Sequence, residues 1–443
     1  MKVILTFILV CFAVVVTSFG ETRRPNFLII FIDDMGYGDP SCYGNKEVET
    51  PAIDELASQG MKFTSFYAQT VCGPSRGALM TGRYPHRVGG GWKTNAEEVT
   101  VAEVLKMAGY ITGCVGKWDM SQRKYQEALI PNSQGFDYYY GALGANDRNQ
   151  VTLYENRKKL ETTTDMAALS RLYTDKSIEF LEKQTDSDEP FFLYLAHTMM
   201  HVVIDASPEF RNRTGKGLYA DTLVELDHEI GRLLGKLDEL GLAENTVVVF
   251  TSDNGPWSND HKRQHKKNET YVEWTKGPEI PWGTSGPLRG AKGTTWEGGV
   301  RVPGIVRWPG RVPKEVTSDA IVSTLDILPT FAALANASEN VPDDRRIDGV
   351  NQKALWLGES ETGSRKGFLY YHNGELQAVR EGDWKLRLPG LKEIIKWPEV
   401  DRGSQKIELY DLGKDLGETT NLVDQHPEVV ERLMGIVEKV KAE

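Results

Sequence analysis

The chain has 443 residues, of which 40% are hydrophobic and 9% aromatic, and this composition excludes an intrinsically disordered protein. A chain of this length can bury a substantial core and predicts a main domain with a smaller second one. Lys and Arg (52) against Asp and Glu (63) give a net charge of −11, which argues against general nucleic-acid binding but leaves room for a local basic pocket.

The first 20 residues have the pattern of a cleaved secretion signal. Lys2 is followed by a largely apolar run from Val3 to Val16, and small or polar residues lead to an expected cleavage position after Gly20. A membrane anchor is the alternative, but the run is shorter than the roughly 20 residues that cross a bilayer. The sequence therefore predicts a signal peptide over 1–20 and a secreted, lysosomal or periplasmic protein without a membrane span.

The apolar run from Asn26 to Ile32 predicts a strand that is buried on both faces. After it, predicted helices and strands alternate as far as residue 250. They are a helix over 50–59, a short helix over 75–80, a helix over 100–108, a strand over 110–115, a helix over 165–184, a strand over 191–196, a helix over 219–240 and a strand over 246–250. This order predicts an α/β fold with a large, mostly parallel sheet flanked by helices.

The short helix over 75–80 follows a cysteine with distinctive surroundings. Pro74 suits the first turn of a helix, and Gly82 suits its C-terminal end. We therefore expect Cys72 at the positive end of the helix dipole, where backbone N–H groups favour an anion. Arg76 adds a planar set of donors that suits sulfate or phosphate. An ordinary buried cysteine before a helix is the alternative.

Polar residues follow four of the predicted strands, at the edge where open α/β sheets hold their sites. They are Asp33 and Asp34 after the first strand, Lys117 after the strand over 110–115, His197 and His201 after the strand over 191–196, and Asp253 and Asn254 after the strand over 246–250. The carboxylates and the amide supply only oxygen ligands, which suit Ca²⁺ or Mg²⁺ rather than Zn²⁺. For each pair taken alone, the capping of an ordinary turn is the alternative.

The last part of the chain begins with a glycine-rich basic segment over 288–303. It contains Lys292, a flexible positive charge that can approach an anion. Beyond it, strand-like runs occupy 368–386 and 407–412. A final amphipathic helix is predicted over 426–440.

Two segments resemble the signatures of the sulfatase family. Cys72-Gly73-Pro74-Ser75-Arg76, with Thr81-Gly82 after it, matches every position of the first signature, and the segment over 288–303 is similar to the second. The resemblance covers about residues 24–425. It implies an alkaline-phosphatase-like fold, with a catalytic α/β sulfatase domain over 21–340 and a small C-terminal α+β subdomain with an antiparallel sheet over 341–443.

The resemblance also implies a chemistry for these residues. A formylglycine-generating enzyme would oxidise Cys72 to Cα-formylglycine, and a hydroxyl of the hydrated aldehyde would attack the sulfur of a sulfate ester. The Ca²⁺ ligands that it implies are Asp33, Asp34, Cys72, Asp253 and Asn254. The residues that it places around the reaction are Cys72, Arg76, Lys117, Asp119, His201 and Lys292. The expected substrate is a sulfated carbohydrate, in the arylsulfatase and N-acetylgalactosamine-6-sulfatase branch, with His201 and Lys292 assisting the leaving oxygen.

One position departs from the family pattern. Gly116-Lys117-Trp118 is usually followed by a histidine, and this chain has Asp119. Residues two apart on a strand share a face, so Asp119 is expected to look into the same pocket as Lys117. An aspartate can still take a proton, but as an anion it would repel sulfate unless Lys117 or the metal ion offsets it. A weakened or non-catalytic glycan-binding homologue is therefore one alternative, and a phosphodiesterase or phosphonate hydrolase with the same nucleophile is another.

Three further features remain open at this point. Cys42 and Cys114 either form one disulfide or stay as two free, buried thiols. Asn212, Asn268 and Asn336 stand in glycosylation sequons, which predict a glycoprotein if the source is eukaryotic. The basic run over 260–267 is either a solvated loop or a rim that attracts a polyanionic sulfated glycan.

Overall fold

The computed structural model describes residues 23–90, 92–185, 187–257, 283–389 and 405–442. The expected signal peptide, the basic run over 260–267 and the sequon at Asn268 lie outside these residues. Within them, no helix combines the length and the apolar composition that crossing a membrane requires. Asn212 and Asn336, which head the other two sequons, are both exposed.

A large sheet forms the middle of the molecule, and its central strands are parallel. In spatial order they are β8 (Thr246–Ser252), β1 (Asn26–Ile32), β7 (Phe191–Ala196), β3 (Ile111–Lys117) and β4 (Tyr138–Ala142). Every residue of β1 is buried, as its continuous apolar sequence predicts. The carboxyl ends of these strands therefore meet along one edge of the sheet.

The two flanks of this sheet contain antiparallel pairs, which the alternation of predicted helices and strands did not reveal. On one flank β9 (Arg301–Arg307) runs antiparallel to β8 and to β2 (Met61–Tyr67), and two short strands, β10 (Val316–Ser318) and β11 (Val322–Ser323), pair with β2. On the other flank β5 (Val151–Glu155) and β6 (Lys158–Thr163) form a hairpin beside β4. The end of the glycine-rich segment is thus a strand, and the β2–β9 register shifts opposite Pro303, which has no N–H to pair.

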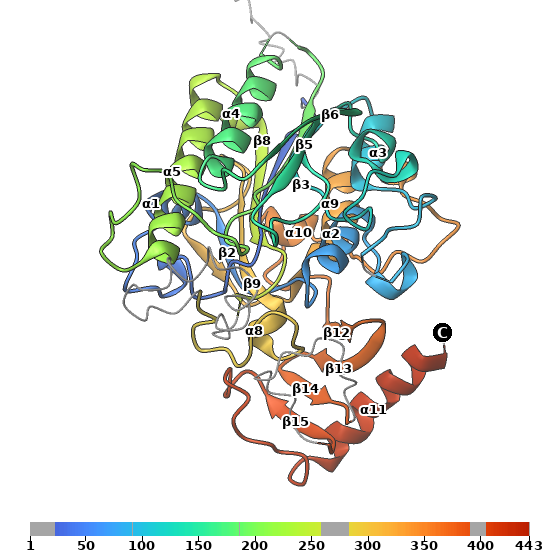
Figure 1. Ribbon diagram of the computed structural model, residues 1–443. Helices are drawn as coiled ribbons and strands as arrows, with labels where there is room; N and C mark the ends of the chain where they lie inside the picture. The colour runs from blue at the N-terminus through green and yellow to red at the C-terminus, as the bar shows by residue number, and fades with distance from the viewer. Residues whose placement is uncertain (1–22, 91, 186, 258–282, 390–404, 443) are drawn as a thin grey trace, which may run out of the picture.

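Helices cover both faces of the sheet (Figure 1), and alternate residues of β1 divide the core between them. Phe27, Ile29 and Phe31 pack in the cluster that includes side chains of α2, α3 and α9. Leu28 and Ile30 pack in the cluster that includes side chains of α1, α4 and α5. The bounds of these helices are α1 Pro51–Ser58, α2 Cys72–Thr81, α3 Val101–Met107, α4 Leu169–Glu182, α5 Leu218–Glu239 and α9 Ile327–Leu334. The short helix α10 (Lys353–Trp356) packs on the α9 side through Leu355 and Trp356.

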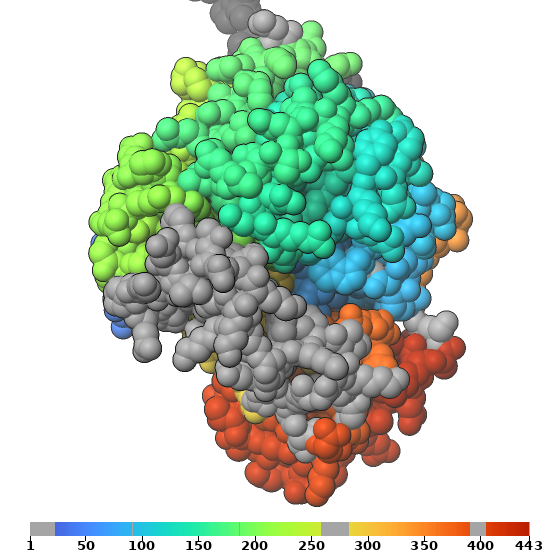
Figure 2. Space-filling model, in the orientation of Figure 1, coloured from blue at the N-terminus to red at the C-terminus, as the bar shows by residue number. Residues whose placement is uncertain are grey.

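A second, smaller sheet forms a separate lobe at the C-terminal end of the chain (Figures 1 and 2). Its four antiparallel strands are β12 (Gly367–His372), β13 (Glu375–Glu381), β14 (Trp384–Arg387) and β15 (Glu408–Asp411). One face is covered by the amphipathic helix α11 (Pro427–Ala442), which buries Val429, Leu433 and Val437. The predicted fold class, an α/β body with a small antiparallel sheet after it, is confirmed.

A buried ion-pair network joins the two sheets. Glu297, the first residue of α8 (Glu297–Val300), pairs with Lys385 of β14 at 2.9 Å and accepts a hydrogen bond from the Tyr370 hydroxyl at 2.8 Å. Lys385 also pairs with Glu418 at 2.8 Å, and its side chain is fully buried. Because α8 follows Lys292 closely in the chain, the C-terminal lobe holds the segment that carries this lysine.

Candidate functional site

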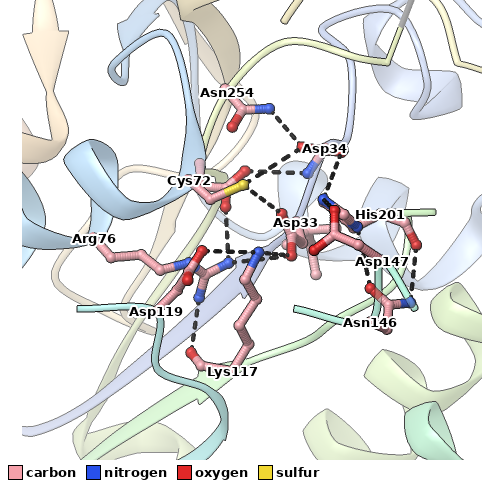
Figure 3. Close-up of polar contacts among 12 residues, drawn as sticks. Asp33, Asp34, Cys72, Arg76, Lys117, Asp119, Asn146, Asp147, His201 and Asn254 are labelled. Atoms are coloured by element: carbon pink, nitrogen blue, oxygen red, sulfur yellow. Dashed lines mark hydrogen bonds and ion pairs between the residues drawn. The ribbon is translucent and has the colours of Figure 1, made fainter. Parts of the chain in front are cut away.

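Most of the residues that follow the parallel strands meet at one buried cluster (Figure 3). Asp33 and Asp34 follow β1, and Asp253 follows its neighbour β8. Lys117 is the last residue of β3 and bonds to Asp33, its Nζ lying 2.5 Å from Oδ2. The backbone N–H of Asp34 donates to Asp253 Oδ1 at 3.1 Å, so the ends of β1 and β8 are tied together. The edge that the sequence predicted for the site is where these side chains lie.

Cys72 reaches this cluster from the start of a helix. It is the first residue of α2, earlier than the predicted helix over 75–80, and the helix ends at Gly82 in the left-handed conformation, as its sequence predicts. Its Sγ lies 3.3 Å from Asp33 Oδ1 and 3.2 Å from Lys292 Nζ. Burial and the nearby carboxylates of Asp253 and Asp33 raise the pKa of the thiol well above its usual value. Burial, together with these carboxylates, therefore keeps the unmodified side chain a neutral thiol.

Three cations neutralise the carboxylates from different elements. Lys292 Nζ lies 2.5 Å from Asp34 Oδ1, and Arg76 Nη2 lies 2.8 Å from Asp253 Oδ2. Burial alone would raise the pKa of Asp33, but Lys117, with His201 and Arg76, holds it well below its usual range. Arg76 also donates to the backbone carbonyl of Lys117 at 2.9 Å. The guanidinium of Arg76 therefore organises the protein around the cluster and does not stand open to a ligand.

The cluster has the donors of a site for a hard divalent cation. One ligand atom from each of Asp33, Asp34, Cys72 and Asp253 lies within 4.8 Å of the others. Asp34 Oδ2 and Asn254 Oδ1 are buried and have no hydrogen-bond partner among the described residues. Burial and Asp33 raise the pKa of Asp253 to about 7, which shows that negative charge is crowded here. Oxygen donors that lack partners are what Ca²⁺ requires, so the residues fit this ion.

His201 stands on the opposite side of the pocket from Arg76 (Figure 3). Its Nε2 lies 3.9 Å from Asp34 Oδ2 and 3.6 Å from Asp147 Oδ1. Its Nδ1 is close to the carbonyl of Val202 and to Asn146 Oδ1, so we assign the proton of the neutral ring to Nδ1. Burial and Lys292 lower the pKa of His201. Nε2 is therefore the ring nitrogen that faces the pocket and can exchange a proton there.

Asp119 lies beside Lys117, but not through strand alternation. It follows the end of β3 and has a φ of 56°, in the left-handed region. Its Oδ2 is 3.4 Å from Lys117 Nζ, and its Oδ1 accepts a hydrogen bond from Arg123 Nε at 2.9 Å. The anionic charge of Asp119 is thus matched by two cations in the folded protein.

Three residues near the cluster were not predicted from the sequence. Asn146 and Asp147 lie in the loop after β4 and contact His201, and Arg123 bridges Asp119 to Asp147, with Nη1 2.5 Å from Asp147 Oδ2. The signal that could have found the first two is the aromatic run at 138–140, which forms β4 and brings its following loop to the same sheet edge. No pattern in the sequence pointed to Arg123.

His197 is the one strand-end residue that stays outside the cluster. It is fully buried, its ring lies 6.5 Å from that of Tyr173, and neither ring nitrogen has a hydrogen-bond partner within the described part of the chain. Burial lowers its pKa to about 3, so the ring is neutral. The ten residues predicted as the nucleophile, as Ca²⁺ ligands or as participants in the reaction all lie in or beside the cluster around Cys72.

Cys42, Cys72 and Cys114 are free thiols, which decides between the two alternatives for Cys42 and Cys114. Burial raises the pKa of Cys42 to about 12, with Asp54 adding to the shift, so this thiol also stays protonated. Neither cysteine takes part in the cluster around Cys72.

Comparisons with known proteins point to one family. The family model for sulfatases matches residues 25–337, and a model described as the C-terminal part of N-sulphoglucosamine sulphohydrolase matches residues 291–443. Arylsulfatase G of Rattus norvegicus is 36% identical over 420 residues, which cover 83% of this chain and 76% of the relative. N-acetylgalactosamine-6-O-sulfatase of Bacteroides thetaiotaomicron is 32% identical over 492 residues, which cover 95% of this chain and 94% of the relative.

Solved structures show the same fold. A sulfatase structure from a study of glycosaminoglycan metabolism by Bacteroides thetaiotaomicron superposes with a TM-score of 0.83 at 30% identity, covering 95% of this chain and all of that one. The phosphonate monoester hydrolase of Agrobacterium radiobacter, at 18% identity and a TM-score of 0.61, shares the fold alone. The matched signatures, the cluster around Cys72 and these relatives together show that the chain belongs to the sulfatase family, a family of sulfuric ester hydrolases.

Proposed function

We propose that the protein is an extracytoplasmic, Ca²⁺-dependent sulfatase that removes sulfate from a sulfated carbohydrate with a formylglycine made from Cys72. The observation that carries the proposal is the position of Cys72 at the start of α2, against Asp33 and Lys292 and within the set of oxygen donors. The names of relatives that act on N-acetylgalactosamine 6-sulfate support a carbohydrate substrate. The proposed catalytic domain is 21–340, with the C-terminal subdomain over 341–443 and the signal peptide over 1–20.

The residues present fit both implied groups. Asp33, Asp34, Asp253 and Asn254, with the modified residue 72, would hold Ca²⁺. When the two groups are in place, the aldehyde hydrate supplies a hydroxyl nucleophile and the ion orients a sulfate oxygen. Lys117 keeps Asp33 ionised, because this lysine is buried against the carboxylate, and Arg76 fixes the position of Asp253.

Two residues of the chain act on the substrate. Lys292, which is 4% exposed, has its Nζ beside residue 72, where it can donate to a sulfate oxygen and stabilise the charge that develops there. His201 presents Nε2 to the pocket and, when protonated, can give this proton to the leaving oxygen of the sugar. Asn146 fixes the ring, because its Oδ1 lies 3.1 Å from Nδ1 and its Nδ2 donates to the backbone carbonyl of His201 at 3.2 Å.

The test has two parts. The protein is produced with and without a formylglycine-generating enzyme, and the peptide that contains Cys72 is examined by mass spectrometry for an aldehyde in place of the thiol. Sulfate release is then measured on a panel of sulfated saccharides and an aryl sulfate, with a phosphate diester and a phosphonate ester as comparison substrates. We expect sulfate release only from the aldehyde form. Full activity of a preparation with an unmodified thiol, or preferred turnover of a phosphorus ester, would refute the proposal.

A further inference from the structure

A second pocket lies beside the catalytic cluster and is not used by the chemistry described so far. It has a volume of about 580 Å³, within the range of sites for small ligands. Residues 122–125 form one wall and residues between 142 and 154 form the other. Arg123 and Asp147 belong to this pocket and also contact Asp119 and His201, so the pocket and the cluster share a border of side chains.

The charge of this pocket is opposite to that of the whole chain. Its lining contains three cations, Arg123, Lys124 and Arg148, and one carboxylate, Asp147. Asp147 already pairs with Arg123 at 2.5 Å. Lys124 and Arg148 are exposed, and in the described part of the chain neither pairs with a carboxylate. A local excess of positive charge in a protein with a net charge of −11 favours an anionic ligand at this position.

Aromatic side chains stand at the rim of the same pocket. Among the described residues only four large apolar side chains are exposed. One of them, Tyr125 (42%), lines the pocket, and another, Trp92 (38%), lies against Arg123 of the pocket wall. The Tyr125 ring stacks on Tyr154 with 5.9 Å between centroids, and the Arg123 guanidinium lies 4.9 Å from the centre of the Trp92 ring. Exposed rings that are held flat by their neighbours offer a face for the apolar side of a sugar ring.

We propose that this pocket binds a second, acidic sugar unit of the substrate, adjacent to the unit that loses its sulfate. Arg148 binds the carboxylate or sulfate of that unit, Arg123 adds to the positive charge, and Tyr125 supports the ring. Arg123 is preorganised for this, because Asp119 and Asp147 fix its guanidinium from two sides. The inference rests on the proposed function and narrows the substrate to an acidic oligosaccharide, which a lone aryl sulfate imitates poorly.

Binding tests the pocket without requiring turnover. The probes are sulfated disaccharides that contain a uronic acid, each paired with the same disaccharide after reduction of its carboxyl group. Affinities are measured by calorimetry on the full chain carrying Cys72→Ala. We expect at least one acidic probe to bind about tenfold more tightly than its reduced partner, as for one lost charge-assisted hydrogen bond. Equal affinities within every pair, or no binding of any probe, would overturn the proposal.

Variants test whether Arg148 causes the preference for acidic probes over reduced ones. In the Cys72→Ala background, Arg148→Ala should bring the ratio of affinities between each acidic probe and its reduced partner close to one. Arg148→Lys should keep part of this ratio. Lys439→Ala, which removes an exposed cation on α11, should keep the full ratio. Thermal melting confirms that each variant is folded. A folded Arg148→Ala protein with the full ratio would refute the role of Arg148.

Sulfate release by the aldehyde-bearing wild type separates the two proposals. Selective binding of acidic probes without release of sulfate would refute the proposed function, while the proposed binding of an acidic sugar in the pocket would stand. Release of sulfate together with equal binding of acidic and reduced probes would refute the proposed binding of an acidic sugar in the pocket, while the proposed function would stand.

Discussion

Asp119 shows how neighbouring charges change what a single substitution means. From the sequence, a carboxylate in place of the family's histidine was expected to repel a bound sulfate unless a cation offsets it. In the structure Lys117 lies 3.4 Å and Arg123 2.9 Å from its oxygens, so the local charge is balanced. The repulsion of sulfate that the sequence suggested is therefore reduced. The carboxylate still lies beside Lys117, where it can accept a proton.

The first prediction concerns the role of this carboxylate. We expect Asp119→Asn to lower kcat by about 10² to 10⁴, the usual cost of losing a positioned acid–base group. Asp119→His should be more active than Asp119→Asn, because it restores a group that can exchange a proton. The measurement is the pH profile of kcat for all three proteins, each with its aldehyde content determined. Equal rates in the three would show that residue 119 takes no part in the reaction.

His372 gives a pH prediction at the residue scale. It is the last residue of β12, 6% exposed, with its Nδ1 2.8 Å from Thr70 Oγ1, close to Cys72 in the chain. Burial lowers the pKa of His372 to about 4, although Glu375 opposes the shift, whereas the usual value is 6.5. Between these pH values the unfolded chain binds the proton and the folded protein does not. The contribution of neutral His372 to the free energy of unfolding is therefore complete above pH 6.5 and is lost as the pH falls toward 4.

We expect the free energy of unfolding to fall by up to about 3 kcal/mol over this range because of His372 alone. Urea denaturation of the wild type and of His372→Gln, at steps from pH 7 to pH 4, checks this. The difference between the two proteins isolates His372, since His197 and the carboxylates titrate in both. A difference that does not change with pH would contradict the prediction.

At the scale of elements, the C-terminal sheet stabilises the segment that carries Lys292. Lys385 of β14 bonds to the carbonyl of Thr295 at 2.8 Å as well as to Glu297 and Glu418. Its partners belong to the α8 region and to the chain after β15, so one buried ammonium ties three parts of the molecule together. Lys385 holds the pKa of Glu297 well below its usual value against the effect of burial, with Arg301 and Arg380 contributing.

Removal of this cation should be costly. We expect Lys385→Met to lower the free energy of unfolding by about 3–5 kcal/mol, because two buried carboxylates lose their partner. Lys439→Met on the exposed face of α11 is the matched control and should change stability by less than about 0.5 kcal/mol. Urea denaturation at pH 7 measures both. Equal stability of the two variants would show that the network contributes little.

At the scale of the whole molecule, the proposed cation site lies between the ends of β1 and β8 and the start of α2. Ca²⁺ bound by the native state alone raises the apparent stability by mass action, by about 2.7 kcal/mol at 100 times its Kd. We therefore expect chelation with EDTA to lower the Tm, calcium to restore it, and zinc not to restore it. Elemental analysis after gel filtration should find calcium, and Asp253→Asn should lose most of the calcium-dependent change in Tm. An unchanged Tm after complete removal of metal would contradict the site.

The sequence alone was sufficient to predict the central strands of the large sheet and several of the helices that pack on it. Continuous apolar runs predicted β1, β7 and β8, and amphipathic periods predicted α4, α5 and α11, because burial and helix period leave a direct mark on local sequence. The antiparallel flanks were not predicted. The β9 sequence contains Pro303 and Gly304, and its pairing with β2 joins residues more than 230 positions apart, so no local pattern reports it.

The sequence also predicted most of the residues that meet in the cluster, since polar groups at the carboxyl ends of neighbouring parallel strands lie along one edge of the sheet. The tertiary structure decided what surrounds them. It placed Arg76 against Asp253, paired Asp119 with Arg123, and placed the basic pocket around Arg148 next to Asp119 and His201. These outcomes depend on distances between side chains from separate elements. Electrostatic and packing energies act across space, and the order of residues along the chain does not encode those distances locally.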